Sequence, residues 1–214
     1  ICATHRHQAL QFICATHVIN YPLIKRQTRS PYFGCKHIES KNMTGTTSGP
    51  TTGLLPRLSI STIGLMFIAG FMATNAFDLW GQVISPALGF ANLSPHGLAK
   101  SLLGKLGLPN SDFAGYFFHF YLVGLIGYPV GWLFIFEPIW TRIVGTKLGW
   151  FVPSAAYGFG LWVFAIGGVT TIAGLPFFLN FTGITWVALV GHVLYGIVMV
   201  AVLRLATAKD QTTT

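Results

Sequence analysis

Four ionisable side chains stand inside or beside long uncharged stretches of this sequence: Asp78, His119, Glu137 and His192. Ionisable groups at membrane depth are energetically costly and are by default candidates for function, so the chemistry of these four needs an explanation. Asp78 and Glu137 lie close to the predicted ends of their stretches, where a carboxylate can sit at the lipid–water interface. His119 lies early in one stretch, and His192 lies about midway along another.

The two histidines are the residues best suited to hold a cofactor. A neutral imidazole nitrogen is a good axial ligand, so His119 and His192 could bind a haem or a chlorin. The predicted directions of their segments place His119 near one membrane face and His192 nearer mid-depth, which disfavours a single haem held by both. The alternative is that both imidazoles are hydrogen-bonded parts of the helix packing. We expect no metal site made of protein ligands alone.

Asp78 and His119 are expected to be neighbours. Asp78 ends one predicted span and His119 begins the next on the same side of the membrane, so we predict that they pair, with Asn75 close by. Such a contact could respond to pH or could be a static hydrogen bond. Asn75, Asp78, His119 and His192 together form the predicted polar cluster, which could also line a path for a proton or a small solute.

The composition places this cluster in an integral membrane protein. Of the 214 residues, 52% are hydrophobic and only 8% are charged, whereas soluble domains average about 25% charged residues. The formal net charge of +8 does not indicate a nucleic-acid partner, because residues 1–42 hold six Lys or Arg and one acid and the rest is thinly spread. No nucleic-acid-binding motif is found.

The fold class predicted from hydropathy is all-α, with four transmembrane helices. The stretch 114–136 has 23 residues without a formal charge, which at the helical rise is about 35 Å, enough to cross a hydrocarbon core of roughly 30 Å. The other three spans are expected to pack around it. Leucines at helical spacing between the first two spans predict a short amphipathic helix in the membrane interface, Pro95–Leu106. The four predicted spans are Leu58–Trp80, Ala114–Phe136, Trp150–Leu175 and Gly183–Leu205.

The predicted domain organisation has one folded unit, 58–205, between polar ends. Residues 1–42 contain the pentapeptide ICATH twice and the cysteines Cys2, Cys14 and Cys35, whose spacing indicates no disulfide framework or zinc site. The first methionine is Met43, so we expect 1–42 to be a non-native extension, the alternative being a disordered basic tail. Residues 43–57 are rich in Gly, Pro, Ser and Thr, as a linker would be, and 206–214 form a polar C-terminal tail.

The distribution of basic residues predicts the orientation. Four spans put both termini on one side, and that side collects five Lys or Arg, whereas the other side has two. Because positive charge marks the cytoplasmic side, both termini are predicted to be cytoplasmic. The five are Arg57, Arg142, Lys147, Arg204 and Lys209, and the two are Lys100 and Lys105.

Three segments carry a resemblance to a family: AGFMATNAFDLWG at 69–81, LLGKLGLP at 102–109 before His119, and HVLYGIV at 192–198. With these segments the chain resembles a family of small four-helix proteins of the bacterial inner membrane. The resemblance covers 58–205 and implies the architecture and the inner, cytoplasmic membrane as the location. It implies no activity.

The function expected from the sequence is that of an accessory or scaffold protein that packs against a larger membrane complex. No HExxH, GxSxG, P-loop or dinucleotide-binding motif is present, so we do not expect an enzyme. The first alternative is a haem or pigment carrier that uses His119 or His192, and the second is a conduit for a small solute or proton. Outside the first alternative no cofactor is expected, and the expected partners are the lipid bilayer and that complex.

Overall fold

The computed structural model describes residues 59–210, with side chains described up to Ala206. Within this range every element is a helix, which confirms the all-α class. The predictions for 1–42 and 43–57 lie outside the described residues, as does the end of the C-terminal tail. Four helical runs are long and apolar enough to cross a membrane, as predicted: Ile60–Ala87 (28 residues), Asp112–Ile143 (32 residues), Phe151–Ile172 (22 residues) and Gly183–Ala206 (24 residues).

The first run begins at a polar cap and extends beyond its predicted end. Ser59 Oγ accepts a hydrogen bond from the backbone N–H of Thr62 at 3.1 Å, which satisfies one of the free donors of the first turn. The helix continues past Trp80 through five residues of π-helical turn. The elements of this run are α1 (Ile60–Leu79), η1 (Trp80–Ile84) and α2 (Ser85–Ala87).

The helix of the second predicted span continues past its predicted end at Phe136, as far as Ile143. Pro138 follows this predicted end, and a proline ordinarily stops a helix. Instead, the proline occupies the first turn of an α-helical segment that follows π-helical turns, a position where the missing N–H is no loss. Pro86 and Pro129 stand in the same relation to the π-helical turns before them. The elements are α4 (Asp112–Phe117), η2 (Phe118–Gly127), α5 (Tyr128–Gly131), η3 (Trp132–Phe136) and α6 (Glu137–Ile143).

The last two runs are joined by an unusual turn. Residues 178–181 all have positive φ, between 47° and 55°, although none of them is glycine. A left-handed conformation costs such residues about 1–2 kcal/mol each. Packing holds it in place, since the Phe178 ring lies 4.8 Å from that of Trp162 and Thr185 Oγ1 donates to Phe178 O at 2.6 Å. The elements are α7 (Phe151–Trp162), η4 (Val163–Val169), α8 (Thr170–Ile172), the turn η5 (Phe177–Phe181) and α9 (Gly183–Asp210).

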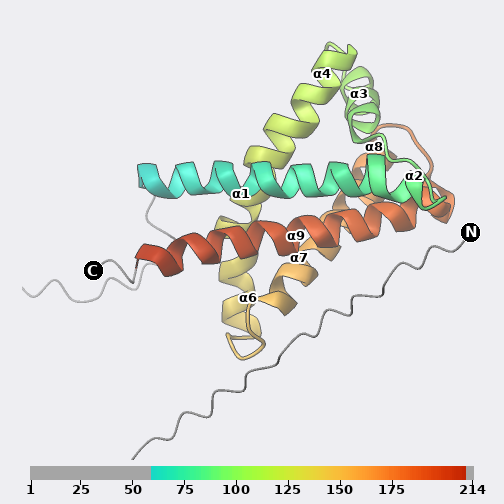
Figure 1. The fold of residues 1–214 in the computed structure, drawn as a ribbon. Coiled ribbons are helices and arrows are strands. Elements are labelled where there is room, and N and C mark those ends of the chain that lie inside the picture. The colour runs from blue at the N-terminus through green and yellow to red at the C-terminus, as the bar shows by residue number, and fades with distance from the viewer. Residues whose placement is uncertain (1–58, 211–214) are drawn as a thin grey trace, which may run out of the picture. The chain divides into compact units, whose positions relative to one another are not determined.

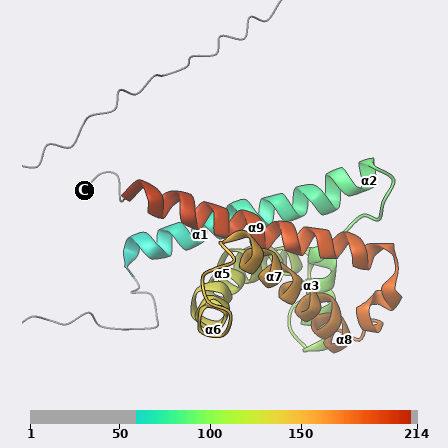
Figure 2. The same ribbon diagram turned by 90° about the horizontal axis from the view of Figure 1, so that it is seen from below.

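The centre of the packing is α9, not the second span as predicted. In Figures 1 and 2, α9 runs antiparallel to α1 on one side and packs along α7 on the other. The most apolar windows of the α7 and α9 runs are 44% buried, whereas that of the second run is 17% buried. Two indole N–H groups from neighbouring helices donate hydrogen bonds to α9. Trp80 of η1 donates to the carbonyl of Val187 (2.9 Å), and Trp162 of α7 donates to the carbonyl of Thr185 (3.0 Å).

The second run crosses α1 and α9 steeply instead of lying alongside them (Figures 1 and 2). The crossing is made by small residues, since a Cβ added at Gly70 would lie 2.8 Å from Gly124 O. Tyr195 reaches the same place from α9 and donates its hydroxyl to Gly124 O at 2.6 Å. Small residues allow helix backbones to approach closely, and a steep crossing means that the four helices do not share one tilt.

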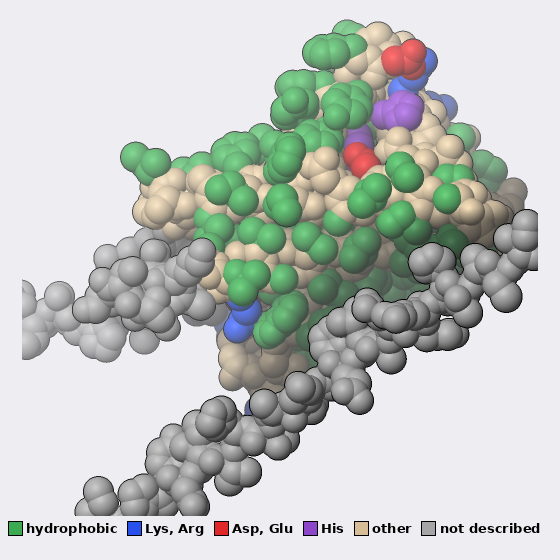
Figure 3. Space-filling view, in the orientation of Figure 1, with side chains coloured by type: hydrophobic (Ala, Val, Ile, Leu, Met, Phe, Trp, Pro, Cys, Tyr) green, Lys and Arg blue, Asp and Glu red, His purple; other side chains and the backbone are tan. Residues whose placement is uncertain are grey.

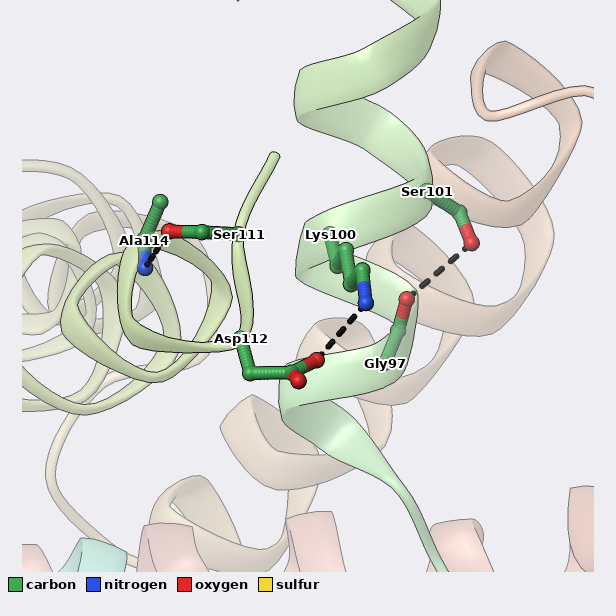
Figure 4. A network of polar contacts seen from close by, with 6 residues as sticks. All are labelled: Gly97, Lys100, Ser101, Ser111, Asp112 and Ala114. Carbon is green, nitrogen blue, oxygen red and sulfur yellow. Dashed lines mark hydrogen bonds and ion pairs between the residues drawn. The ribbon is translucent and has the colours of Figure 1, made fainter. Parts of the chain in front are cut away.

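The connection between the first two runs contains the helix α3 (Pro95–Lys105), at the place where an amphipathic helix was predicted. Ala99 and Leu103 are buried, and α3 packs against α4. Lys100 Nζ lies 2.7 Å from Asp112 Oδ1 across this contact, and Ser111 Oγ caps α4 by accepting from Ala114 N at 3.2 Å (Figure 4). The position of α3 at a membrane interface stays a prediction.

Candidate functional site: a pocket between the helices

Asp78 and His119 form the contact that the sequence predicts. His119 Nε2 lies 3.1 Å from Asp78 Oδ1, and the two side chains keep 15% and 19% of their surface exposed. Asp78 lies well inside its helical run instead of at its end, because the π-helical turns carry the helix on to Ala87. Asn75 does not share the bond, since its side chain is exposed and its amide donates to Phe71 O at 2.7 Å.

His192 is the most buried of the predicted site residues, with 5% of its surface exposed. Its Nδ1 lies 2.7 Å from Ala188 O, one turn earlier in α9. A carbonyl oxygen can only accept, so Nδ1 carries the hydrogen and donates it. In the neutral imidazole the lone pair is then on Nε2, and no described residue donates a hydrogen bond to that nitrogen.

The steep crossing brings the two histidines to one site. Phe77 packs against both, with its ring centroid 4.9 Å from that of His192 and 6.0 Å from that of His119. His119 and His192 are expected at different depths only if the four helices run side by side. In the structure both rings line the same pocket.

This pocket has a volume of about 300 Å³. Its walls come from α1, η2, α3, η4 and α9, with Leu179 of the left-handed turn and Tyr128 of α5 completing them. Most of the lining side chains are apolar. Those with polar atoms are Thr74, Ser94, His119, Tyr128, His192 and Tyr195.

Besides His119, which is bonded to Asp78, two of these residues have hydroxyl groups that are already satisfied within the protein. Thr74 Oγ1 donates to Gly70 O at 2.7 Å, and the Tyr195 hydroxyl is held by Gly124 O. The hydroxyl of Tyr128 makes no hydrogen bond to any described residue, although its backbone carbonyl accepts from Tyr157 at 2.5 Å. No described side-chain nitrogen or oxygen is both fully buried and unpaired. The free Tyr128 hydroxyl and His192 Nε2 are therefore not fully buried, and both residues line the pocket.

Tyr128, Tyr195 and the residues of α3 that line the pocket were not predicted from the sequence. An aromatic residue in an apolar helix is as well explained by packing, so neither tyrosine stood out. Glu137 does not belong to the site. It is half-buried outside the pocket, with the Trp132 side chain and Arg204 as its electrostatic partners.

The donor set limits what the pocket can hold. Within the described residues no group of three or more His, Cys, Asp or Glu could hold a metal ion. His192 Nε2 could serve as one axial ligand of a haem, but no Lys or Arg lines the pocket to pair with haem carboxylates. A proton path has little support, since Thr74, His192 and Tyr195 each donate a hydrogen bond to a backbone carbonyl. The arrangement suits a small neutral molecule that is mostly apolar.

Comparison with known proteins gives no match, whether with protein-family models, curated proteins or solved structures.

Proposed function

We propose that the protein is an integral membrane protein that binds a small, neutral, mostly apolar molecule in the pocket between its helices. The observation that carries this proposal is the pocket of about 300 Å³, lined mainly by apolar side chains from helices far apart in the sequence. That volume is at the lower end of the range typical of ligand pockets, roughly 300–1,000 Å³. A two-ring aromatic molecule is an appropriate size for a first probe.

The surface and the helix lengths support membrane insertion. Figure 3 shows a face on which hydrophobic side chains are spread over the helices and charged ones are few, and large residues such as Phe113 and Phe164 are 77% and 60% exposed. The first two runs, of 28 and 32 residues, are longer than the roughly 20 needed to cross a bilayer upright. Longer helices are accommodated by tilting, and a steep crossing requires tilt.

We further propose that both termini are cytoplasmic, in the inner membrane of a bacterium. The beginning of α1 and the last turns of α9 lie at the same end of this antiparallel pair (Figure 1). On the other side, the end of α3 approaches the turn after α8, with Lys105 Nζ 3.9 Å from a Cβ built at Gly174. This grouping agrees with the charge distribution that predicts the orientation.

The test is the thermal stability of the purified protein in detergent with and without naphthalene. A molecule that binds only the folded state stabilises it by about 2.7 kcal/mol at 100 times its dissociation constant, so naphthalene should raise Tm in a concentration-dependent way. Ala165→Phe fills the pocket from η4 and should abolish the rise. Ala156→Phe, on a half-buried position of α7 outside the pocket lining, is the matched control and should retain it.

Two results would contradict the proposal. One is a wild-type Tm that does not respond to naphthalene, and the other is a response of the same size in Ala165→Phe. Ala188→Leu, which fills the pocket from α9, provides a second test if Ala165→Phe does not fold.

A second candidate function is that of an accessory subunit of a larger membrane complex. It is favoured by the second run, which is the least buried of the four and carries stacked, exposed aromatic side chains. A photo-crosslinking amino acid at Tyr121, which is 44% exposed, should capture a protein partner in native membranes, whereas the same group at the buried Trp132 should not. Adducts with lipid alone would count against this candidate.

A further inference from the structure

We infer that the ligand of the pocket carries a hydroxyl group, which donates a hydrogen bond to Nε2 of His192. This inference rests on the proposed function and names the chemical class: a neutral, lipid-soluble phenol or alcohol. Three observations carry it, namely the fixed tautomer of His192, the free hydroxyl of Tyr128 and the aromatic rings of the lining.

The first observation fixes what His192 can do. Because Nδ1 donates to Ala188 O at 2.7 Å, the remaining nitrogen can only accept a hydrogen bond while the ring is neutral. A protonated ring would need an acidic partner, since a buried charge without one is strongly disfavoured. Asp78 is the acid near the pocket, and it is already bonded to His119. The other titratable groups that line the pocket are Tyr128 and Tyr195.

The second observation concerns the group beside His192. The Tyr128 ring centroid lies 6.4 Å from that of His192, and the Tyr128 hydroxyl is free among the described residues. A tyrosine hydroxyl can both donate and accept. The pocket thus offers an acceptor at His192 and a group that can donate at Tyr128. A ligand hydroxyl can satisfy both, whereas a ketone or an ether can only accept and would leave His192 without a partner.

The third observation favours an aromatic skeleton. Phe77 packs edge-on against His192 with an interplanar angle of 76°, and Tyr128 packs edge-on against Tyr195 at 5.2 Å and 82°. Aromatic rings stabilise one another in such arrangements beyond the area they bury. A phenol would place a further ring beside Phe77 and Tyr128 and its hydroxyl at His192.

The experiment compares two molecules of nearly equal shape, 2-naphthol and 2-methylnaphthalene, for binding to the protein in lipid nanodiscs. Empty nanodiscs of the same lipid correct for partition, so that affinity refers to the concentration in the lipid phase. One net hydrogen bond in a buried site corresponds to roughly fivefold to tenfold in affinity, so 2-naphthol should be favoured by that factor. If neither molecule binds, the proposed function fails. If both bind equally, only the hydroxyl inference fails.

Substitutions then identify the acceptor. His192→Phe should remove the preference for 2-naphthol, and His192→Gln should retain part of it because the amide oxygen can accept. His96→Phe, the same substitution outside the pocket lining, should leave the preference unchanged. A full preference in His192→Phe would overturn the assignment.

A measurement on the unsubstituted protein tests the inference if the His192 variants do not fold. With ¹⁵N-labelled histidine, 2-naphthol should shift the Nε2 resonance of one histidine, and 2-methylnaphthalene should not. An Nε2 resonance that 2-naphthol leaves unmoved would overturn the inference.

Discussion

Asp78 and His119 each have the other as a hydrogen-bond partner, at 3.1 Å, in surroundings that leave less than a fifth of either side chain exposed. We predict that His119→Ala destabilises the fold by about 1–3 kcal/mol, because the carboxylate is left without its partner in a partly buried position. Asp78→Asn should be milder, since an amide oxygen can still accept from His119. The measurement is unfolding in detergent, with His96→Ala as the matched control.

The double variant separates the pair from general effects on packing. If the contact stabilises the fold, the two single losses should not add, and the double-mutant cycle should give a coupling energy of about 0.5–3 kcal/mol. The cycle uses Asp78→Ala in place of Asp78→Asn, because each single variant must remove the contact. Additive losses of His119→Ala and Asp78→Ala would mean that the contact contributes nothing.

The pairing of Asp78 with His119 could be predicted from the sequence, because the end of one span lies beside the start of the next span. It could not reveal that Asn75 bonds to its own helix, or that Ala188 O fixes the tautomer of His192. Both depend on a side-chain rotamer, which has no signature in hydropathy. The free hydroxyl of Tyr128 is equally invisible in the sequence.

At the scale of the helices, α7 provides two glycines with opposite surroundings. A Cβ at Gly158 would lie 2.6 Å from Val193 Cα of α9, whereas a Cβ at Gly160 would meet nothing within 4 Å. We predict that Gly158→Ala destabilises the protein by about 1–3 kcal/mol, because the α7–α9 contact is forced apart. Gly160→Ala should cost nothing, since alanine is the better helix former.

The comparison is made by thermal unfolding of the two variants in the same detergent. Equal Tm values for Gly158→Ala and Gly160→Ala would contradict the close α7–α9 approach. Lower stability of Gly160→Ala alone would indicate a partner on the outer face of α7.

The four helices could be predicted because apolar runs long enough to cross a bilayer are a strong signal. The residues at which the helices end, and which helix is most buried, could not be predicted. Glu137 and Pro138 are ordinary stop signals, and they fail here because π-helical turns precede the proline. The left-handed turn at 178–181 contains only one residue, Asn180, that favours this conformation. Its packing against Trp162 overrides local preference. The uncharged stretch 114–136 was expected to be the centre of the packing, although an uncharged helix can face lipid as readily as protein.

At the scale of the whole folded unit, the pocket follows from the steep crossing at Gly124. Helices that cross steeply touch at one place and diverge from it, so the second run leaves a wedge-shaped space beside α1 and α9. The helix α3 and the turns around η4 and η5 fill part of this wedge, and the pocket is what they leave. A crossing angle is set by which small residues meet, here Gly70 and Gly124, and this pairing could not be derived from one sequence.

The orientation of the whole unit yields a prediction for the cell. In a background with Cys2, Cys14 and Cys35 replaced by serine, Asn92→Cys should react with a membrane-impermeant maleimide in intact spheroplasts, because the proposed orientation places the 88–94 connection outside. Thr146→Cys, in the loop between α6 and α7, should react only after permeabilisation, because positively charged loops stay inside. Both native side chains are exposed.

The control is Ala188→Cys, at a position 2% exposed, which should remain unlabelled in both conditions. The reverse pattern would invert the orientation, and labelling of both exposed positions in intact spheroplasts would contradict an arrangement in which the second run crosses the membrane.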